Sequence, residues 1–167
     1  DSGDRILFVG STRGEYRPIV RDALAAGVDV AVYGVGWGEF LPPERIAGEF
    51  IANDRLPAAY ASAGVVLNDH WPDMAAEGFL SNRLFDAAAC ASRILSDDAA
   101  GLHDVFGDGI RTYADPAELA ALLTADPADA FPDDRARRTL AAHVAVEHSF
   151  DARVAVLIDR AYELRAA

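Results

Sequence analysis

Short apolar runs alternate with helical segments along most of this 167-residue chain, and this alternation restricts the possible folds more than any other feature. RILFVG (5–10), VDVAVYG (28–34) and VVLND (65–69) are bounded by glycine or polar residues, which is typical of strands buried on both faces. Between the first two, RPIVRDALAAG (17–27) has apolar residues at helical spacing. The alternation therefore predicts an α/β fold with a parallel sheet covered by helices on both faces.

About six strands are expected, and the chain is predicted to form one Rossmann-like, doubly wound domain over residues 1–167. Asp115 is predicted to cap a helix that has Pro116 at its first position. The stretch 125–130 is the most loop-like and is predicted to be a hinge before a helical tail. Strands are expected at 5–10, 28–34, 49–53, 65–69, 93–97 and 110–114, and helices at 17–27, 57–64, 82–90, 102–107, 115–123 and, in two segments meeting near 148–150, over 133–167.

Charge and cysteine content exclude several classes of partner. The formal net charge is -12, so a basic surface for nucleic acid is absent and no nucleic-acid partner is expected. No apolar run approaches the roughly 20 residues of a membrane span, so no transmembrane segment is expected. The single cysteine, Cys90, cannot form a disulfide within the chain, which favours a reducing compartment and a cytoplasmic location.

Ligands of such a sheet bind outside the carboxyl ends of the strands, where the strand order reverses. The loop after the first strand, Gly10–Gly14, contains neither the GxGxxG dinucleotide motif nor a GxxxxGK[ST] phosphate loop. The run GVGWG (34–38) also lacks the dinucleotide motif, and tight turns explain its glycines. Arg13 and Arg17 are interpreted as solvated surface residues, with a phosphate contact as the alternative.

The segment EGFLSNRLFD (77–86) places polar residues where a buried helix begins. Ser81 can cap that helix, and Arg83 in the first turn opposes the helix dipole, which favours a compensating anion nearby. Asp86 follows Arg83 by three residues on the same face. One interpretation is an intrahelical Arg83–Asp86 ion pair. The other is a carboxylate that accepts hydrogen bonds from ribose hydroxyls while the helix end and Arg83 hold a diphosphate, as in a nucleotide-sugar site.

The segment LPAAYASAGVVLNDHWPDMAAEGFLSNRLFDAAACASRILSD (56–97) resembles the nucleotide-sugar-binding half of GT-B glycosyltransferases, in the group 1 family with a GFxSNRxFE-type motif. The likeness extends from Arg5 through Ser149–Arg153. It implies one Rossmann-like half of a GT-B fold, in a transferase that moves a sugar from a nucleotide-diphosphate sugar to an unknown acceptor. We therefore expect the chain to be the C-terminal half of a longer enzyme. The acceptor-binding N-terminal domain would lie outside it, and the chain alone would be inactive.

The resemblance also implies roles for individual residues. Asp86 would bind the ribose, Arg13 a phosphate, and residues 53–57 the base, while Glu77 and Arg83 would be catalytic. The full expected donor set is Gly10, Ser11, Arg13, Asn53, Leu56, Asn68, Gly78, Phe79, Ser81, Asn82, Arg83 and Asp86. No metal or other cofactor is expected, because His70, His103, His143 and His148 are scattered along the chain.

The sequence departs from the family pattern in two places. Eight residues separate Glu77 from Asp86, where broader relatives have seven between two glutamates, and Ala91 stands where relatives usually have glycine.

Two other functions are compatible with a Rossmann-like domain. A non-catalytic Rossmann-type module that binds a nucleotide or a protein partner is the alternative function. An NAD-dependent oxidoreductase is a third, weakened by the missing GxGxxG motif.

Overall fold

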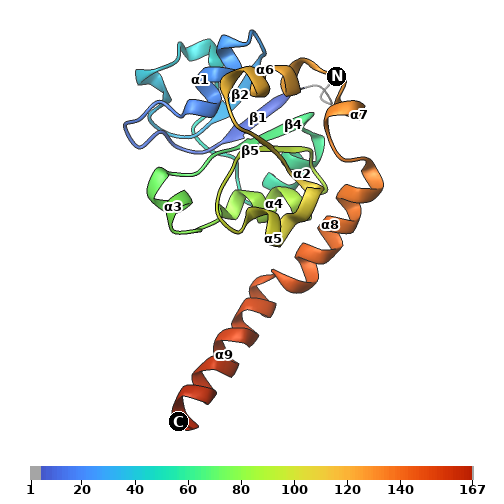
Figure 1. The fold of residues 1–167 in the computed structure, drawn as a ribbon. Helices are drawn as coiled ribbons and strands as arrows, with labels where there is room; N and C mark the ends of the chain where they lie inside the picture. The colour runs from blue at the N-terminus through green and yellow to red at the C-terminus, as the bar shows by residue number, and fades with distance from the viewer. Residues whose placement is uncertain (1–4, 167) are drawn as a thin grey trace.

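The apolar runs form the strands of one sheet, and the segments between them form helices on its two faces (Figure 1). The computed structural model describes residues 5–166. All five strand pairings are parallel, in the order β3-β2-β1-β4-β5-β6, which confirms the expected Rossmann-like α/β class. The strands are β1 (Ile6–Val9), β2 (Val30–Tyr33), β3 (Ile46–Gly48), β4 (Val65–Asn68), β5 (Ile94–Asp97) and β6 (Arg111–Tyr113).

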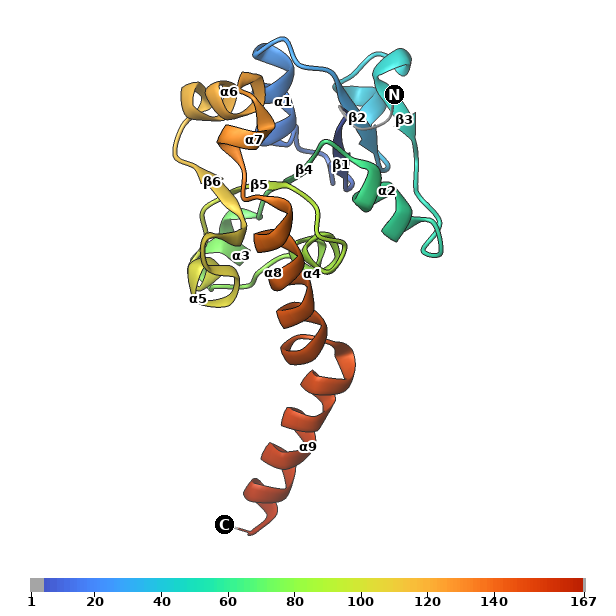
Figure 2. The same cartoon turned by 90° about the vertical axis from the view of Figure 1, so that its right-hand side faces the viewer.

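The helices form one layer above the sheet and one below it, as the two perpendicular views show (Figure 2). Helices α1 and α6 lie on one face, and α2, α4 and α5 lie on the other, where α8 packs along α4. The α-helices are α1 (Pro18–Ala25), α2 (Leu56–Ser62), α3 (Pro72–Ala76), α4 (Asn82–Ala89), α5 (Leu102–Phe106), α6 (Pro116–Thr124), α7 (Pro127–Ala130), α8 (Asp134–Glu147) and α9 (Phe150–Ala166); the 3-10 turns are η1 (Trp37–Glu39), η2 (Pro43–Arg45) and η3 (Gly107–Gly109).

Alternate residues of β1, β2, β4 and β5 enter two separate cores. In β1, Phe8 packs with Trp37 and Leu119 on one side of the sheet, whereas Leu7 packs with Leu84 on the other. Burial on both faces explains why the strands are nearly continuous apolar runs in the sequence. It also holds the loops at the carboxyl ends of β1 and β4 on a rigid base.

Two expected elements are wrong in the structure. The third strand was expected at 49–53 but is β3, because Ile46 and Gly48 pair with β2 and Phe50 is 77% exposed. The expected hinge at 125–130 contains helix α7, since Asp126 caps it through the N–H of Ala128 and a proline follows the cap. In both cases hydrogen bonds of the backbone N–H and carbonyl groups decide the element, and the residue types alone did not show where these bonds would form.

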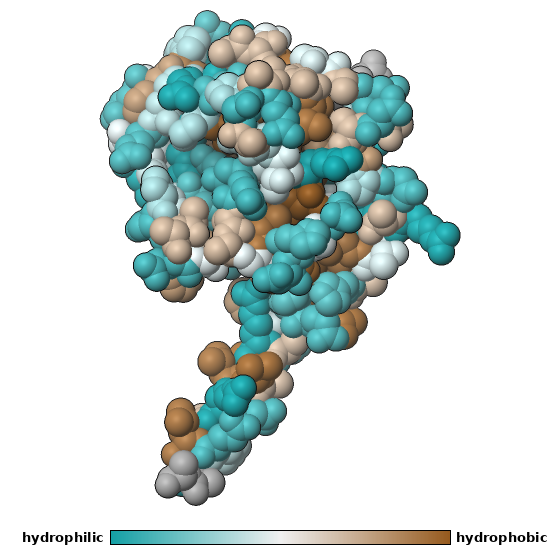
Figure 3. Space-filling view, viewed as in Figure 1, coloured by the Kyte–Doolittle hydropathy of each residue, from teal (hydrophilic) through white to brown (hydrophobic). Residues whose placement is uncertain are grey.

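Helix ends agree better with the sequence. The carboxylate of Asp115 accepts hydrogen bonds from the N–H groups of Ala117 and Glu118 (2.9 Å each), which confirms the predicted cap. The tail forms α8 and α9 in two segments, as expected, and α9 extends away from the sheet with apolar side chains exposed along it (Figures 1 and 3). No helix within residues 5–166 is long and apolar enough to cross a membrane.

Ala91 has a left-handed backbone conformation (φ 55°), which glycine adopts with less strain than alanine. It follows the end of α4, where its own N–H bonds to the carbonyl of Ala88 and the N–H of Ser92 bonds to the carbonyl of Ala87. This is the hydrogen-bond pattern of a Schellman motif. The departure at Ala91 therefore lies in a helix end and leaves the chain path into β5 intact.

Candidate functional site

The strand order reverses between β1 and β4, so the carboxyl ends of these two strands form the switch point of the sheet. The loop after β1 begins with Gly10 and Ser11, and the loop after β4 begins with Asp69. Helix α4 starts at the same edge, where the hydroxyl of Ser81 accepts a hydrogen bond from the N–H of Arg83 (3.3 Å). Residues from three separate segments therefore gather at one place.

Glycine allows the loops after β1 and β2 to touch. A Cβ on Gly34, which has φ 148°, would collide with the backbone carbonyl of Gly10. The indole N–H of Trp37 donates to that carbonyl (2.8 Å), and the hydroxyl of Ser11 accepts a hydrogen bond from the loop after β2 (3.2 Å). A Cβ on Gly10 would also collide with the guanidinium of Arg83. The tight-turn interpretation of GVGWG is confirmed, and Gly10 leaves space for an arginine.

Arg83 turns inward from the first turn of α4. Its Nη1 lies 3.3 Å from Oδ1 of Asn68 and 3.8 Å from the carboxylate of Asp69, and its guanidinium lies over the ring of Phe8 at 4.4 Å. Burial lowers the pKa of this guanidinium, and Asp69 partly offsets the effect. The ion pairs of the described residues include Arg83 with Asp69 and not with Asp86, so the intrahelical interpretation is wrong. Arg83 is held instead at the switch point.

Arg17 is buried, contrary to its interpretation as a solvated residue. Its Nε and Nη2 donate to the two carboxylate oxygens of Asp69 at 2.8 and 2.6 Å, and its guanidinium lies 4.0 Å from the ring of Trp71. The side chains of Arg17 and Asp69 are only 5% and 4% exposed. Sequence reasoning missed this pair, although Asp69 directly follows a buried strand, because 52 residues separate the two partners.

Two guanidinium groups thus share the carboxylate of Asp69 at the switch point: Arg17 in a bidentate pair and Arg83 at 3.8 Å. Asp97 acts on Arg83 only at longer range. A buried cation without its own counter-ion is costly, and a bound anion would lower that cost. The start of α4, with its N–H groups and partial positive charge, adds to the same preference.

A chain of hydrogen bonds continues from Arg83 across the carboxyl ends of β4 and β5. Asn68 accepts from Arg83 and donates to the hydroxyl of Ser96 (2.9 Å), which in turn donates to Asp97 (3.1 Å). The other end of the chain is His70, whose Nδ1 lies 2.7 Å from the carboxylate of Asp97. Sequence reasoning placed Asn68 in the site but did not identify its partners. The chain fixes the orientation of the amide that contacts Arg83.

Asp86 lies one turn into α4 beside a hollow of ≈ 400 Å³ between α2 and α4, here called the α2–α4 hollow. Three residues of the segment expected to border the base, Asn53, Leu56 and Pro57, line the same hollow. Asp86 is an exposed residue whose carboxyl is partly covered; this partial burial raises its pKa, and the positive charge of Arg153 opposes that rise. The complete lining is Asn53, Leu56, Pro57, Tyr60, Asp86, Ala89 and Cys90.

A second hollow, of ≈ 300 Å³, lies between α4 and the junction of α8 with α9, and is called here the α4–α9 hollow. Asp86 lines this hollow as well, and Arg153 enters it from α9. Sequence reasoning missed these junction residues; the only indication was that the family likeness continued through Ser149–Arg153. The lining is Asn82, Phe85, Asp86, Ala89, Val144, Ala145, His148, Ser149, Phe150 and Arg153.

The remaining predicted residues lie on the outer rim of the carboxyl edge. Glu77 is exposed at the end of α3, Gly78 has a positive φ of 69°, and Phe79 is 65% exposed. Arg13 is also exposed, with its guanidinium 5.7 Å from the ring of Trp71. Within residues 5–166 no group of three or more His, Cys, Asp or Glu side chains is arranged to hold a metal ion.

Solved structures with a similar fold include two glycosyltransferases and a sucrose-phosphate synthase. Sucrose-phosphate synthase from Thermosynechococcus elongatus aligns with a TM-score of 0.68 and 16% identity over 97% of this chain and 45% of that chain. AviGT4, a glycosyltransferase involved in avilamycin A biosynthesis, aligns with a TM-score of 0.56 and 20% identity over 87% of this chain and 48% of that chain. The glycotransferase of kitacinnamycin aligns with a TM-score of 0.52 and 15% identity, over 93% of this chain and 43% of that chain. The fold is therefore one half of a GT-B fold, and the chain spans less than half the length of these proteins.

The family follows from the sequence match. A family model described as glycosyl transferase-like matches residues 13–159, which is most of the chain. This chain belongs to that glycosyl transferase-like family, in agreement with the resemblance to group 1 GT-B enzymes. No curated protein matches the sequence at a significant level.

Proposed function

We propose that this chain is the half of a glycosyltransferase that binds a nucleotide-diphosphate sugar. The observation that carries the proposal is the position of Asp86. It lines the α2–α4 hollow with Asn53 and Leu56, on the same helix whose first turn carries Arg83. A ribose in this hollow would donate its hydroxyl hydrogen bonds to Asp86, the base would lie against residues 53–57, and the diphosphate would lie at the start of α4.

The chemistry of the proposed reaction requires stabilisation of a leaving group. When the bond between the sugar and the diphosphate breaks, negative charge develops on the departing phosphate oxygen. In the proposal, Arg83 and the N–H groups of the first turn of α4 stabilise that charge, and Glu77 contacts the sugar. No bound metal is required by this proposal. The other residues assigned to the diphosphate, the sugar and their surroundings are Gly10, Ser11, Arg13, Asn68, Gly78, Phe79, Ser81 and Asn82.

The proposal places the acceptor in another domain. The solved neighbours are about twice as long as this chain, which supports an N-terminal half that binds the acceptor. The exposed apolar side chains on α9 support a packing partner outside the described residues (Figure 3). We therefore expect the chain alone to bind the donor and not to transfer the sugar. A cytoplasmic location is part of the same proposal.

The test is calorimetry and thermal shift of the 167-residue chain against UDP, GDP, ADP, dTDP and NAD, alone and as sugar conjugates. One nucleoside diphosphate should bind in preference to the others and to NAD, and EDTA should not reduce its binding. Asp86→Ala should abolish that binding, because the ribose loses its acceptor, without changing the unfolding midpoint. Asp129→Ala, an exposed carboxylate on α7, is the matched control and should bind like the parent.

Other outcomes would change the assignment in distinct ways. If Asp86→Ala bound the diphosphate as well as the parent does, the ribose assignment would be wrong. Preferential binding of NAD would favour an oxidoreductase. No binding by any of these nucleotides would favour a module that docks to a protein partner.

A further inference from the structure

The junction between α8 and α9 supplies side chains to the hollow that also holds Asp86. The two helices meet at His148 and Ser149, and both residues line the α4–α9 hollow together with Arg153 from the first turns of α9. Residues separated from Asp86 by more than 60 positions in the sequence therefore line the same hollow as its carboxylate. The junction is thus part of the surroundings of the proposed ribose site.

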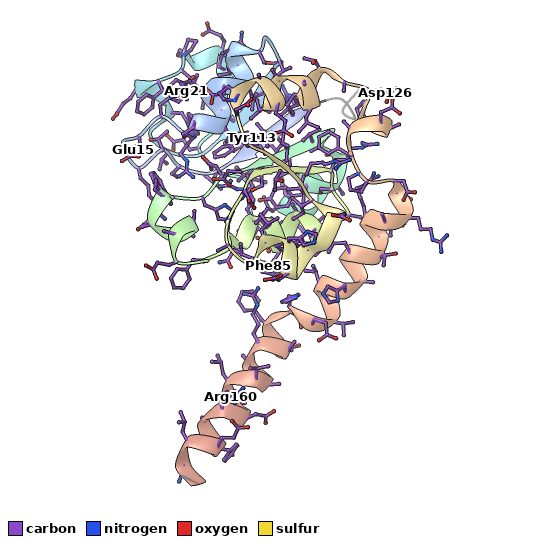
Figure 4. All side chains as sticks on the ribbon, viewed as in Figure 1. Glu15, Arg21, Phe85, Tyr113, Asp126 and Arg160 are labelled. Carbon is purple, nitrogen blue, oxygen red and sulfur yellow. The ribbon has the colours of Figure 1, made fainter. Side chains whose placement is uncertain are left out.

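Phe85 holds this junction against α4. Its ring packs against Phe106 at 4.9 Å and against the imidazole of His148 at 5.4 Å, and the guanidinium of Arg153 lies over it at 4.3 Å. The contact between Arg153 and Phe85 has the distance of a cation–π interaction, and it restrains the long arginine side chain. Figure 4 shows Phe85 on the side of the body from which α9 departs. Arg153 is therefore held over the ring of Phe85, at the hollow that Asp86 also lines.

Arg153 is a cation whose charge acts on Asp86. Tyr60 on α2 is neutral at physiological pH, and burial raises its pKa further, to about 12; burial also raises the pKa of the Cys90 thiol at the end of α4. At the junction, burial lowers the pKa of His148, so its imidazole is neutral near pH 7. Burial disfavours the charged form of Asp86, and the charge of Arg153 acts in the opposite sense.

We propose that Arg153 is a positioning residue that, from the start of α9, keeps the Asp86 carboxylate charged in the place where a ribose would bind. Arg153 acts through Asp86 and does not itself contact the nucleotide. The identity of the ligand rests on the proposed function, whereas the effect of the Arg153 charge on Asp86 is a property of the chain without ligand. The C-terminal junction would thereby determine the pH range in which the donor binds.

The first test follows the titration of the Asp86 carboxyl carbon by NMR in the chain without ligand. Arg153→Met should raise the pH at which Asp86 loses its proton, since the opposing charge is removed. Arg153→Lys should largely retain the parental midpoint. Arg160→Met is the matched control, because Arg160 lies on the same helix and pairs with Glu163 at 2.7 Å (Figure 4). An Asp86 midpoint that is equal in Arg153→Met and the parent would overturn the inference.

The second test measures UDP, GDP, ADP and dTDP binding as a function of pH. Near the Asp86 midpoint, Arg153→Met should bind the preferred diphosphate about two- to fivefold more weakly, and the difference should vanish at higher pH. In an Asp86→Asn background, Arg153→Met should have no further effect; an equal loss there would show a structural role and overturn the inference. A shifted Asp86 midpoint in a chain that binds none of the four would overturn the proposed function and leave the effect of Arg153 on Asp86 in place.

Discussion

Replacing Asp69 by asparagine removes the carboxylate that the buried Arg17 and the largely buried Arg83 share, and it changes the volume of the side chain very little. The two oxygens of Asp69 accept hydrogen bonds from Arg17 at 2.8 and 2.6 Å, and both side chains are at most 5% exposed. An asparagine offers one oxygen and turns an NH₂ group toward a guanidinium donor. Arg17 would then be left as a buried charge without a counter-ion.

Breaking one partner of a buried ion pair costs about 3–5 kcal/mol. This is a large part of the roughly 5–15 kcal/mol by which a domain is stable. With a urea dependence of about 1–3 kcal/mol per molar, Asp69→Asn should lower the unfolding midpoint by more than about 1 M. The assay is urea unfolding followed by circular dichroism.

The matched control is Arg138→Met, which removes an exposed ion pair with Asp134 (2.7 Å; side chains 74% and 62% exposed). That substitution should cost less than about 1 kcal/mol, because water already screens both charges. If Asp69→Asn lowered the midpoint no more than Arg138→Met does, the shared-carboxylate description of the switch point would be refuted.

Two further predictions concern helix α4 and the core beside it. Ala91→Gly should stabilise the chain by about 0.5–1 kcal/mol in urea unfolding, since glycine adopts φ 55° without strain, whereas Ala89→Gly inside the same helix should destabilise it by a similar amount. Tyr60 has a folded-state pKa of about 12 against 10.0 for the free side chain, so the folded chain keeps a proton that the unfolded chain loses. Stability should therefore fall as the pH rises from 10 to about 12, by about 1 kcal/mol at about pH 11, and Tyr60→Phe should remove that part of the slope; an unchanged slope would show that Tyr60 titrates normally in the fold.

The alternation of apolar runs was enough to predict the sheet, its parallel class and most element boundaries. Each of these depends on a local property: a strand buried on both faces must be apolar at every position, and a helix start must satisfy its free N–H groups. The Asp115 cap is such a case, because all of its partners lie within three residues. The boundaries of β3 were wrong because pairing with β2, and not apolar character, decides where that strand ends.

The partners of the site residues depended on tertiary structure. The sequence placed Arg83 and Asp86 on one helix face and left their pairing open, and only the fold shows Arg83 turned toward Asn68 and Asp69. Strand order brings the loops after β1 and β4 together, and with them the Arg17–Asp69 pair.

In the same way, the packing of α8 on α4 brings Arg153 to Asp86. Burial periodicity and capping act within a few residues, so the sequence by itself determined the elements and the edge of the sheet at which a ligand would bind. The Arg17–Asp69 ion pair spans 52 positions, and 67 positions separate Asp86 from Arg153 in the hollow that both line. Such neighbours depend on how the elements pack, and so only the tertiary structure decided them.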